Sequence, residues 1–157
     1  MNNLERNIKV FIKILNMVNN KKNPIILSGS TSLALQGVDI EVHDIDIVTD
    51  KEGAILLDNL LKENNINKMK YRETDTYKSY FGQYIIDNIK VEIMGEFQYK
   101  LKNGKWSKEN HLHEIKYIEY DGVDIPVLSL EQEMLEYENT NRIQTVKRIN
   151  EKIQKDR

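Results

Sequence analysis

The sequence predicts an α/β (α+β) fold, in which one mixed β-sheet carries helices mainly on one face and further helices follow at the C-terminal end. Two observations predict this class. Apolar side chains recur at helical spacing in some segments and alternate with polar side chains in others, as in amphipathic helices and half-buried strands. Capping residues and turn pairs separate these segments. Helical and strand segments that alternate along a chain favour a sheet flanked by helices.

The first part of the chain predicts a helix, a strand and a second, short helix. Residues 4–19 carry apolar side chains at the spacing of an amphipathic helix. The segment Pro24–Leu27 is typical of a short buried strand, and the small residues Ser28–Ser30 form a turn after it. Residues 31–36 are then expected to form a short helix that Gly37 closes.

A second strand is expected at Asp44–Val48, where apolar and charged residues alternate. Thr49 and Glu52 have the spacing of a capping box, in which each side chain binds a free backbone N–H of the first helical turn. The helix that they would start runs to about Lys62, and Asn64-Asn65 ends it.

The rest of the chain predicts three hairpins and then helices. The hairpins are marked by turn pairs: Asp87-Asn88 between the strands Tyr80–Ile86 and Ile89–Met94, Asn103-Gly104 before Trp106, and Asp121-Gly122. Ser129 and Gln132 have the spacing of another capping box and open a helical segment. A last apolar stripe at helical spacing runs from Ile143 to Ile153.

Length and composition limit the class of protein. A chain of 157 residues is expected to form a single domain, with a core at about 25–95 and hairpins and helices at about 96–157. The formal net charge of -2 argues against binding of duplex DNA, because phosphate binding needs a basic face. The chain has no cysteine, no long apolar run and no signal-peptide pattern, so a soluble cytoplasmic protein without a membrane partner is expected.

Two aspartates and one glutamate are the candidate catalytic and metal-binding residues. Asp44 and Asp46 are one residue apart in a predicted strand, so both carboxylates project from one face. Glu92 alternates with apolar residues in a later strand, and it joins the two aspartates if the two strands are neighbours in the sheet. Oxygen ligands of this kind suit Mg²⁺, or Mn²⁺. The alternative is an exposed edge strand whose carboxylates are solvated by water.

The turn Ser28-Gly29-Ser30 is the candidate nucleotide-binding segment. It lies between a buried strand and a short helix, so its amides and hydroxyls are placed to hold phosphate oxygens. A plain strand-to-helix turn has the same composition, and this motif alone is weak evidence.

The order of these motifs resembles the nucleotidyltransferase superfamily, which includes DNA polymerase beta, the aminoglycoside and lincosamide nucleotidyltransferases and small minimal members from prokaryotes. The resemblance covers about residues 25–95. It is carried by LSGSTSLAL at 27–35, VHDIDIVTD at 42–50 and VEIMG at 91–95.

The resemblance implies an enzyme that transfers a nucleoside monophosphate from a nucleoside triphosphate such as ATP to an acceptor hydroxyl and releases pyrophosphate. It implies that Gly29 and Ser30 contact the triphosphate and that Asp44, Asp46 and Glu92 coordinate Mg²⁺. The third carboxylate of the family is usually Asp, so Glu92 is a longer substitute. The family's basic residues in the late helix have no clear match, which leaves the roles of Arg142, Lys147 and Arg148 open.

Other interpretations remain open or rank lower. A nucleotidyltransferase-fold binding module, acting as one half of a toxin–antitoxin or defence pair, is the second hypothesis. The acceptor is a small molecule, an RNA or a protein, and a partner protein or a homodimer is expected to complete the site because the chain is short. Two other classes fit the sequence less well. The later motifs of a haloacid dehalogenase phosphatase are not evident, and the chain is short for a nucleotide-sugar glycosyltransferase.

Three further groups of residues are assigned no catalytic role. The aromatic side chains could stack on a nucleobase or pack in the core: Tyr71, Tyr77, Tyr80, Phe81 and Tyr84. The acidic residues at 131, 133, 136 and 138 are expected on a solvated helix face. His111 and His113 are expected to be surface residues.

Overall fold

The structure, a computed structural model, describes residues 1–18, 22–108 and 115–157. His111 and His113, expected at the surface, lie outside these residues. The helices are α1 (Asn3–Met17), α2 (Gly29–Leu35), α3 (Lys51–Leu60), the 3-10 turn η1 (Lys62–Asn64), α4 (Leu130–Asn139) and α5 (Ile143–Lys155). The strands are β1 (Ile25–Ser28), β2 (Ile45–Thr49), β3 (Asn65–Glu73), β4 (Tyr77–Ile86), β5 (Ile89–Tyr99), β6 (Ile115–Tyr120) and β7 (Val123–Leu128).

The described strands form one seven-stranded mixed sheet in the order β3-β4-β5-β2-β1-β7-β6. The pairs β2/β5 and β1/β7 are parallel, and the other neighbouring pairs are antiparallel. This sheet confirms the predicted α/β class. The parallel pairs matter for the site, because they bring strands that are far apart in the sequence together at the centre of the sheet.

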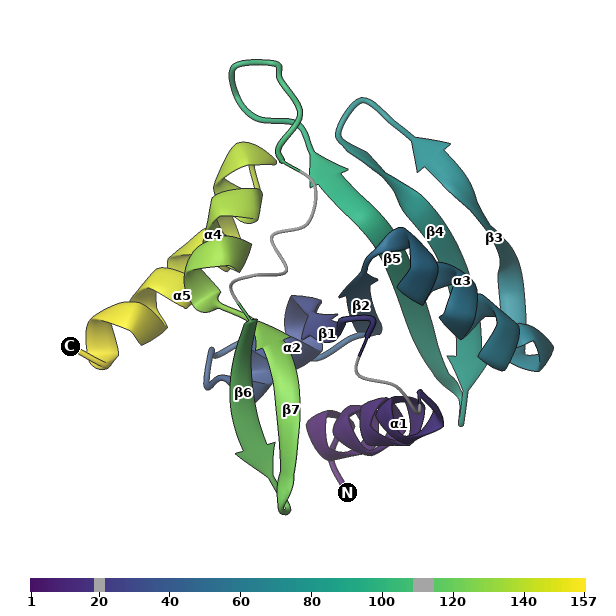
Figure 1. The fold of residues 1–157 in the computed structure, drawn as a ribbon. Coiled ribbons are helices and arrows are strands. Elements are labelled where there is room, and N and C mark those ends of the chain that lie inside the picture. The colour runs from purple at the N-terminus through teal and green to yellow at the C-terminus, as the bar shows by residue number, and fades with distance from the viewer. Residues whose placement is uncertain (19–21, 109–114) are drawn as a thin grey trace.

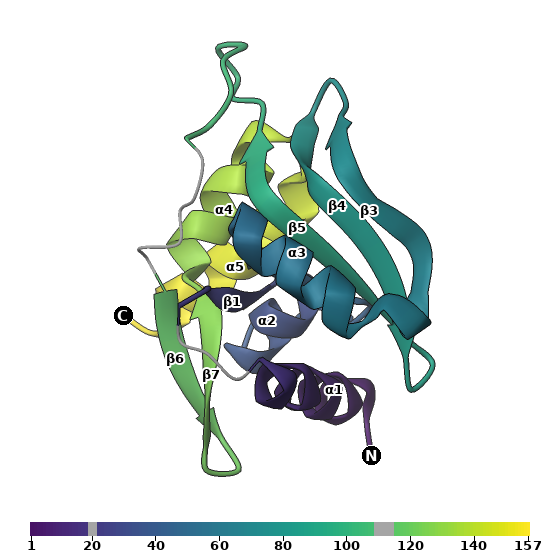
Figure 2. The same cartoon turned by 45° about the vertical axis from the view of Figure 1, so that its right-hand side comes forward.

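Helices lie on both sides of the sheet, as Figures 1 and 2 show together. α1 and α3 cover one face, where Phe11, Ile14 and Leu57 pack against Ile47 and Ile93 of the central strands. α4 and α5 lie on the other side and pack against α2 through a second apolar cluster. We expected helices mainly on one face and a free second face, but α4 and α5 partly enclose that second face.

Several predicted boundaries need correction. Asp50, not Thr49, caps α3, because the Asp50 side chain accepts the Gly53 N–H while the Thr49 hydroxyl donates to the Pro24 carbonyl. α2 begins at Gly29, two residues before the predicted start. Strand β3 was not predicted at all. The Ser129 cap of α4 is confirmed by the bond that its hydroxyl accepts from the Gln132 N–H.

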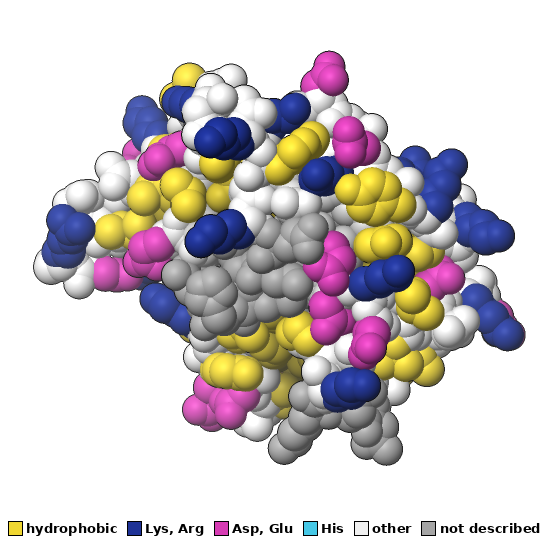
Figure 3. Space-filling model, turned by 45° about the horizontal axis from the view of Figure 1, so that its top comes forward, with side chains coloured by type: hydrophobic (Ala, Val, Ile, Leu, Met, Phe, Trp, Pro, Cys, Tyr) yellow, Lys and Arg dark blue, Asp and Glu magenta, His cyan; other side chains and the backbone are white. Residues whose placement is uncertain are grey.

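Two further features concern the distribution of charged and apolar residues. Lys, Arg, Asp and Glu side chains are interspersed over the face in Figure 3, rather than gathered by sign. Among the residues that the structure describes, no helix is both long and apolar enough to cross a membrane.

Candidate active site

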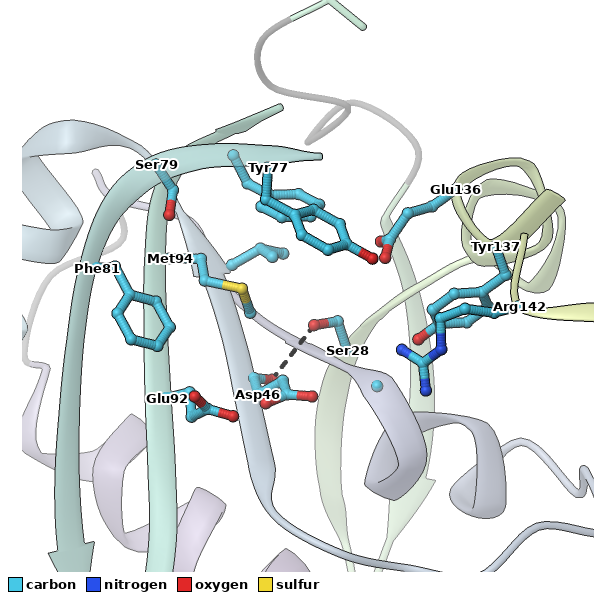
Figure 4. Close-up of a pocket in the computed structure, with 13 residues that line it drawn as sticks. Ser28, Asp46, Tyr77, Ser79, Phe81, Glu92, Met94, Glu136, Tyr137 and Arg142 are labelled. Atoms are coloured by element: carbon cyan, nitrogen blue, oxygen red, sulfur yellow. Dashed lines mark hydrogen bonds between the residues drawn. The ribbon is translucent and has the colours of Figure 1, made fainter. Parts of the chain in front are cut away.

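A cavity of about 260 Å³ lies between the open face of the sheet and the α4–α5 corner (Figure 4). Strands β1, β2, β4 and β5 form one wall, and the other wall comes from α4 and the residue that precedes α5. The residues that line it are Ser28, Gly29, Asp46, Val48, Tyr77, Ser79, Phe81, Glu92, Met94, Phe97, Glu136, Tyr137 and Arg142. The lining therefore combines polar and charged side chains with aromatic and apolar ones.

Two of the predicted acidic residues stand side by side in this cavity. β2 and β5 are parallel neighbours, and Asp46 is the register partner of Glu92. Ile45 and Ile47 turn into the core on the α1/α3 side, so the intervening Asp46 faces the cavity. The strand adjacency that the sequence argument required is thus confirmed, and Figure 4 shows both carboxylates at the floor of the cavity.

Asp44 does not line the cavity in this structure. It lies just before β2, and its carboxylate is 3.6 Å from the Lys90 ammonium on the neighbouring strand. Among the described residues, no three His, Cys, Asp or Glu side chains stand together as a ready-made set of metal ligands. The structure therefore places two of the three predicted carboxylates together and turns the third toward a lysine.

The environment of Asp46 favours a bound cation. Burial, reinforced by the charges of Glu92 and Asp44, raises the pKa of Asp46 from its ordinary 3.8 to about 8. A divalent cation between these carboxylates would offset both effects. Mg²⁺ is typically bound by one or two protein carboxylates together with waters and substrate phosphates, so the pair Asp46 and Glu92 fits the donor set that this ion takes.

The turn that was predicted to hold phosphate is built around Gly29. The backbone of this residue has φ +70°, a conformation that residues other than glycine rarely adopt. A Cβ atom at this position would overlap the Asp46 Oδ2. Its backbone N–H donates to the Glu133 Oε1 at 2.7 Å. The glycine thus lets the backbone approach the Asp46 carboxylate closely.

A small polar network fastens the segment around this turn. The Ser30 hydroxyl accepts from the His43 N–H at 2.9 Å, and the Thr31 hydroxyl donates to the Asp44 carbonyl at 2.9 Å. Buried Asn7 of α1 donates both to the Thr31 hydroxyl and to the His43 carbonyl. These bonds hold α2 against the segment that leads into β2. They therefore fix the position of the turn relative to Asp46.

Two acidic residues of α4 belong to the site, contrary to the expectation that the acidic run lies on a solvated face. Glu133 is only 1% exposed, and Glu136 lines the cavity, whereas Glu131 and Glu138 are exposed as expected. Burial raises the pKa of Glu136 to about 7, although the nearby Arg142 charge opposes the shift. Helical spacing alone places one side of α4 inward, but the sequence does not show what that side meets.

Among the described residues that line the cavity, Arg142 is the only lysine or arginine. Its guanidinium lies over the Tyr137 ring, 4.7 Å from the ring centroid, and Figure 4 shows it above the Asp46 side of the cavity. Arg148 instead lies 3.5 Å from Asp39 and outside the cavity. The structure thus separates these two arginines, whose roles the sequence left open.

The aromatic residues divide between the two faces of β4. Tyr77 and Phe81 line the cavity, and Tyr77 stacks on Phe97 with ring centroids 5.6 Å apart. Tyr84 is fully buried on the α3 side, where its hydroxyl donates to Asp58 at 2.6 Å. Tyr71 and Tyr80 form an edge-to-face pair. Core packing therefore accounts for Tyr84, whereas Tyr77 and Phe81 face the cavity.

Comparisons with known proteins agree with this architecture. The model of the family described as aminoglycoside-2''-adenylyltransferase matches residues 10–152. The crystal structure of TM1012 from Thermotoga maritima, described as a candidate nucleotidyltransferase, superposes with a TM-score of 0.80 at 38% identity, over 99% of this chain and 96% of that one. The lincomycin-bound lincosamide antibiotic adenylyltransferase LnuA superposes with a TM-score of 0.58 at 15% identity, over 90% and 95% of the two chains, and shows a shared fold. No curated protein matches the chain.

The mixed sheet and the similarity to TM1012 identify the chain as a member of the nucleotidyltransferase superfamily, as the motif order implied. More particularly, the chain belongs to the aminoglycoside-2''-adenylyltransferase family, a family of enzymes.

Proposed function

We propose that the protein transfers AMP from ATP to a hydroxyl group of a small-molecule acceptor, with Mg²⁺ or Mn²⁺ held by Asp46 and Glu92. The observation that supports this most strongly is the register pairing of Asp46 with Glu92 in a cavity that also contains Gly29 and Arg142. The family description supports adenylyl transfer. Asp44 would join the ligand set by leaving Lys90.

In the reaction, the acceptor oxygen attacks the α-phosphorus of ATP. A new oxygen–phosphorus bond forms, the bond from the α-phosphorus to the bridging oxygen breaks, and pyrophosphate leaves. The hydroxyl proton passes to Glu92, whose carboxylate faces the cavity. Divalent ions held by the carboxylates supply charge neutralisation of the triphosphate and of the developing negative charge.

The other residues of the cavity position the substrates. Arg142 is placed to neutralise the departing pyrophosphate, since a guanidinium binds phosphate oxygens in two-pronged geometry. Ser30, which was predicted to contact the triphosphate, does not line the cavity, and its hydroxyl accepts from the His43 N–H at 2.9 Å. The aromatic side chains of Tyr77, Phe81 and Phe97 offer stacking surface for the base or the acceptor.

The proposal is tested with α-labelled ATP, GTP, CTP and UTP in the presence of Mg²⁺ and fractions of a cell extract that contain small molecules, RNA or protein. We expect label from ATP in the small-molecule fraction. Asp46→Asn and Glu92→Gln should abolish it, whereas the matched surface variant Asp124→Asn should not. Label that appears only in RNA or protein would overturn the acceptor class.

The same experiment separates the enzyme from a binding module of a toxin–antitoxin or defence pair. A module predicts a stable complex with a partner protein that persists in Asp46→Asn, together with no transfer by the wild type. That combination of results would overturn the proposal. Transfer that is lost in Asp46→Asn would support it.

A further inference from the structure

Five polar residues form a single row across five strands of the open sheet face. Register pairing joins Ser28 to Asp46, Asp46 to Glu92, Glu92 to Gln83, and Gln83 to Asn67. The row therefore runs from β1 through β2, β5 and β4 to the edge strand β3. Side chains that are directly opposite on one face of a sheet are close enough to interact.

Hydrogen bonds give the outer part of this row a fixed direction. The Gln83 Nε2 donates to the Glu92 Oε2 at 2.8 Å, and the Asn67 Nδ2 donates to the Gln83 Oε1. Because Asn67 uses the acceptor oxygen of the Gln83 amide, the donor end of that amide faces Glu92. Asn65 secures the segment, since its Nδ2 donates to the Gln83 backbone carbonyl at 3.1 Å.

We propose that Gln83 is a positioning residue for Glu92 and that Asn67 sets the direction in which the Gln83 amide points. The bond to Oε2 fixes the rotation of the Glu92 carboxylate and leaves its other oxygen for the ligand in the cavity. Neither amide lines the cavity, so both act through Glu92 and not on the substrate. This inference rests on the proposed function, in which Glu92 binds the cation.

The expected size of the effect follows from general experience with the outer shells of metal sites. Partners that orient a metal ligand typically contribute about 10- to 100-fold to metal affinity or activity. A glutamate has several rotatable bonds, and holding it in one orientation before the cation arrives reduces the entropy lost on binding. The effect should therefore appear in the affinity for the cation even when no nucleotide is present.

Two substitutions test the two parts of the proposal. Gln83→Met removes the donor and keeps the length of the side chain. Asn67→Asp replaces a donor with an acceptor of the same shape, so the Gln83 amide turns round and presents its oxygen to Glu92. Both variants should bind Mn²⁺ alone about 10-fold more weakly, measured by electron paramagnetic resonance, and should lower kcat more than they raise KM for ATP.

Matched controls exclude general effects of the substitutions. Gln154→Met on α5 and Asn88→Asp at the β4–β5 turn change exposed residues in the same chemical way and should bind Mn²⁺ like the wild type. Thermal unfolding should show similar Tm values for all variants. In the metal-free protein, the side-chain amide NMR signals of Gln83 should shift in Asn67→Asp and stay in place in Asn88→Asp.

The outcomes are distinguishable. If Asp46→Asn loses Mn²⁺ binding while Gln83→Met and Asn67→Asp bind like the wild type, this inference is wrong and the proposed function stands. If the wild type binds no Mn²⁺, the proposed metal site and this inference fall together.

Discussion

The backbone N–H of Gly29 donates a 2.7 Å hydrogen bond to the Glu133 carboxylate, which lies 104 residues further along the chain. This bond ties α4 to the turn beside Asp46. Glu133 is buried, the Tyr137 hydroxyl donates to the same oxygen at 3.3 Å, and the other oxygen has no hydrogen-bond partner among the described residues. Burial raises the pKa of Glu133 well above its ordinary value, although the Gly29 bond opposes this shift.

The first prediction concerns pH and stability. A carboxyl group with a raised pKa holds its proton in the folded state after the unfolded state has lost it. The free energy of unfolding therefore falls as the pH rises above about 4.5, the ordinary pKa of Glu133. Glu133→Gln cannot titrate and still offers an oxygen to Gly29. Urea unfolding at pH 5 and pH 8 should show a smaller loss of stability in Glu133→Gln than in the wild type.

Glu131→Gln is the matched control, since Glu131 is exposed on the same helix. It should keep the pH dependence of the wild type. Equal pH dependence in the wild type and Glu133→Gln would show that Glu133 is ionised in the folded protein across this range.

The second prediction separates two reasons for a glycine at position 29. Gly29 and Gly104 both have positive φ, +70° and +85°, but a Cβ at Gly29 would overlap Asp46, whereas a Cβ at Gly104 has no atom within 4 Å. Alanine at either position costs about 1–2 kcal/mol of backbone strain. Gly29→Ala should lose more stability than Gly104→Ala in urea unfolding, and only Gly29→Ala should lose nucleotidyl transfer. Equal losses of stability would mean that Asp46 moves aside freely.

The third prediction is that Asp46 is needed for transfer but lowers the free energy of unfolding of the metal-free protein. Because its pKa rises from 3.8 to about 8, the folded state binds a proton that the unfolded state has lost above pH 4. Metal-free Asp46→Asn should be more stable than the wild type at pH 8, by about 2–5 kcal/mol, and this gain should shrink toward pH 4. Its transfer activity should fall more than about 100-fold. Mg²⁺ should raise the Tm of the wild type only.

Metal-free unfolding of Asp124→Asn provides the reference for this comparison, because Asp124 is exposed on β7. A destabilised Asp46→Asn at pH 8 would contradict the argument, since it would mean that the carboxylate contributes more as a hydrogen-bond partner than it costs as a buried charge.

Local patterns predicted the parts of the fold that have strong local signals. The alternation around Asp46 and Glu92 predicted two strands and the face of each, and the turn Asp87-Asn88, with positive φ at both residues, joins β4 and β5 as expected. Strand β3 was missed because it lies at the sheet edge, most of its side chains are exposed, and its alternation is limited to residues 69–72 by register shifts in the preceding part of the strand. An edge strand is defined by its partner, which a local pattern does not reveal.

The candidate site was predictable to the same extent. Asp46, Glu92 and Gly29 have the residue types and order that the chemistry requires, and the structure brings them together. Glu133 and Glu136 were misjudged because an acidic run on a helix is usually solvated. Their burial depends on α4 lying against the turn at Gly29, a contact between distant segments. The orientation of Asp44 toward Lys90 depends in the same way on the β2–β5 pairing.

The fourth prediction distinguishes the two arginines at the C-terminal end. Arg142 lines the cavity, whereas Arg148 pairs with Asp39 and Glu151 on the surface. Arg142→Gln should weaken ATP binding about 10-fold, because one charged contact to a phosphate is worth about 1.4 kcal/mol or more. Arg148→Gln should change binding little. Isothermal titration with a non-transferable ATP analogue measures both, and equal affinities in the two variants would exclude Arg142 from the phosphate site.

The fifth prediction concerns Glu136, whose raised pKa of about 7 makes its charge change within the range of ordinary assays. Below pH 7 its carboxyl group is neutral, and above pH 7 it adds a negative charge to a cavity that receives a polyanion. Two like charges about 10 Å apart repel by about 1–2 kcal/mol in a partly hydrated site, or about 10-fold in affinity. The affinity for the ATP analogue with Mg²⁺, relative to that of Glu136→Gln, should therefore fall about 10-fold between pH 6 and pH 8.

The comparison with Glu136→Gln removes every contribution that does not depend on the Glu136 charge, although this charge also raises the pKa of Asp46 and so acts partly through that residue. Glu138→Gln changes an exposed residue of the same helix and should follow the wild type at every pH. The fall should be centred near pH 7, because Glu136 ionises there. A constant ratio of affinities across this pH range would contradict the prediction, because it would mean either that Glu136 keeps one charge state throughout or that the nucleotide lies beyond the reach of its charge.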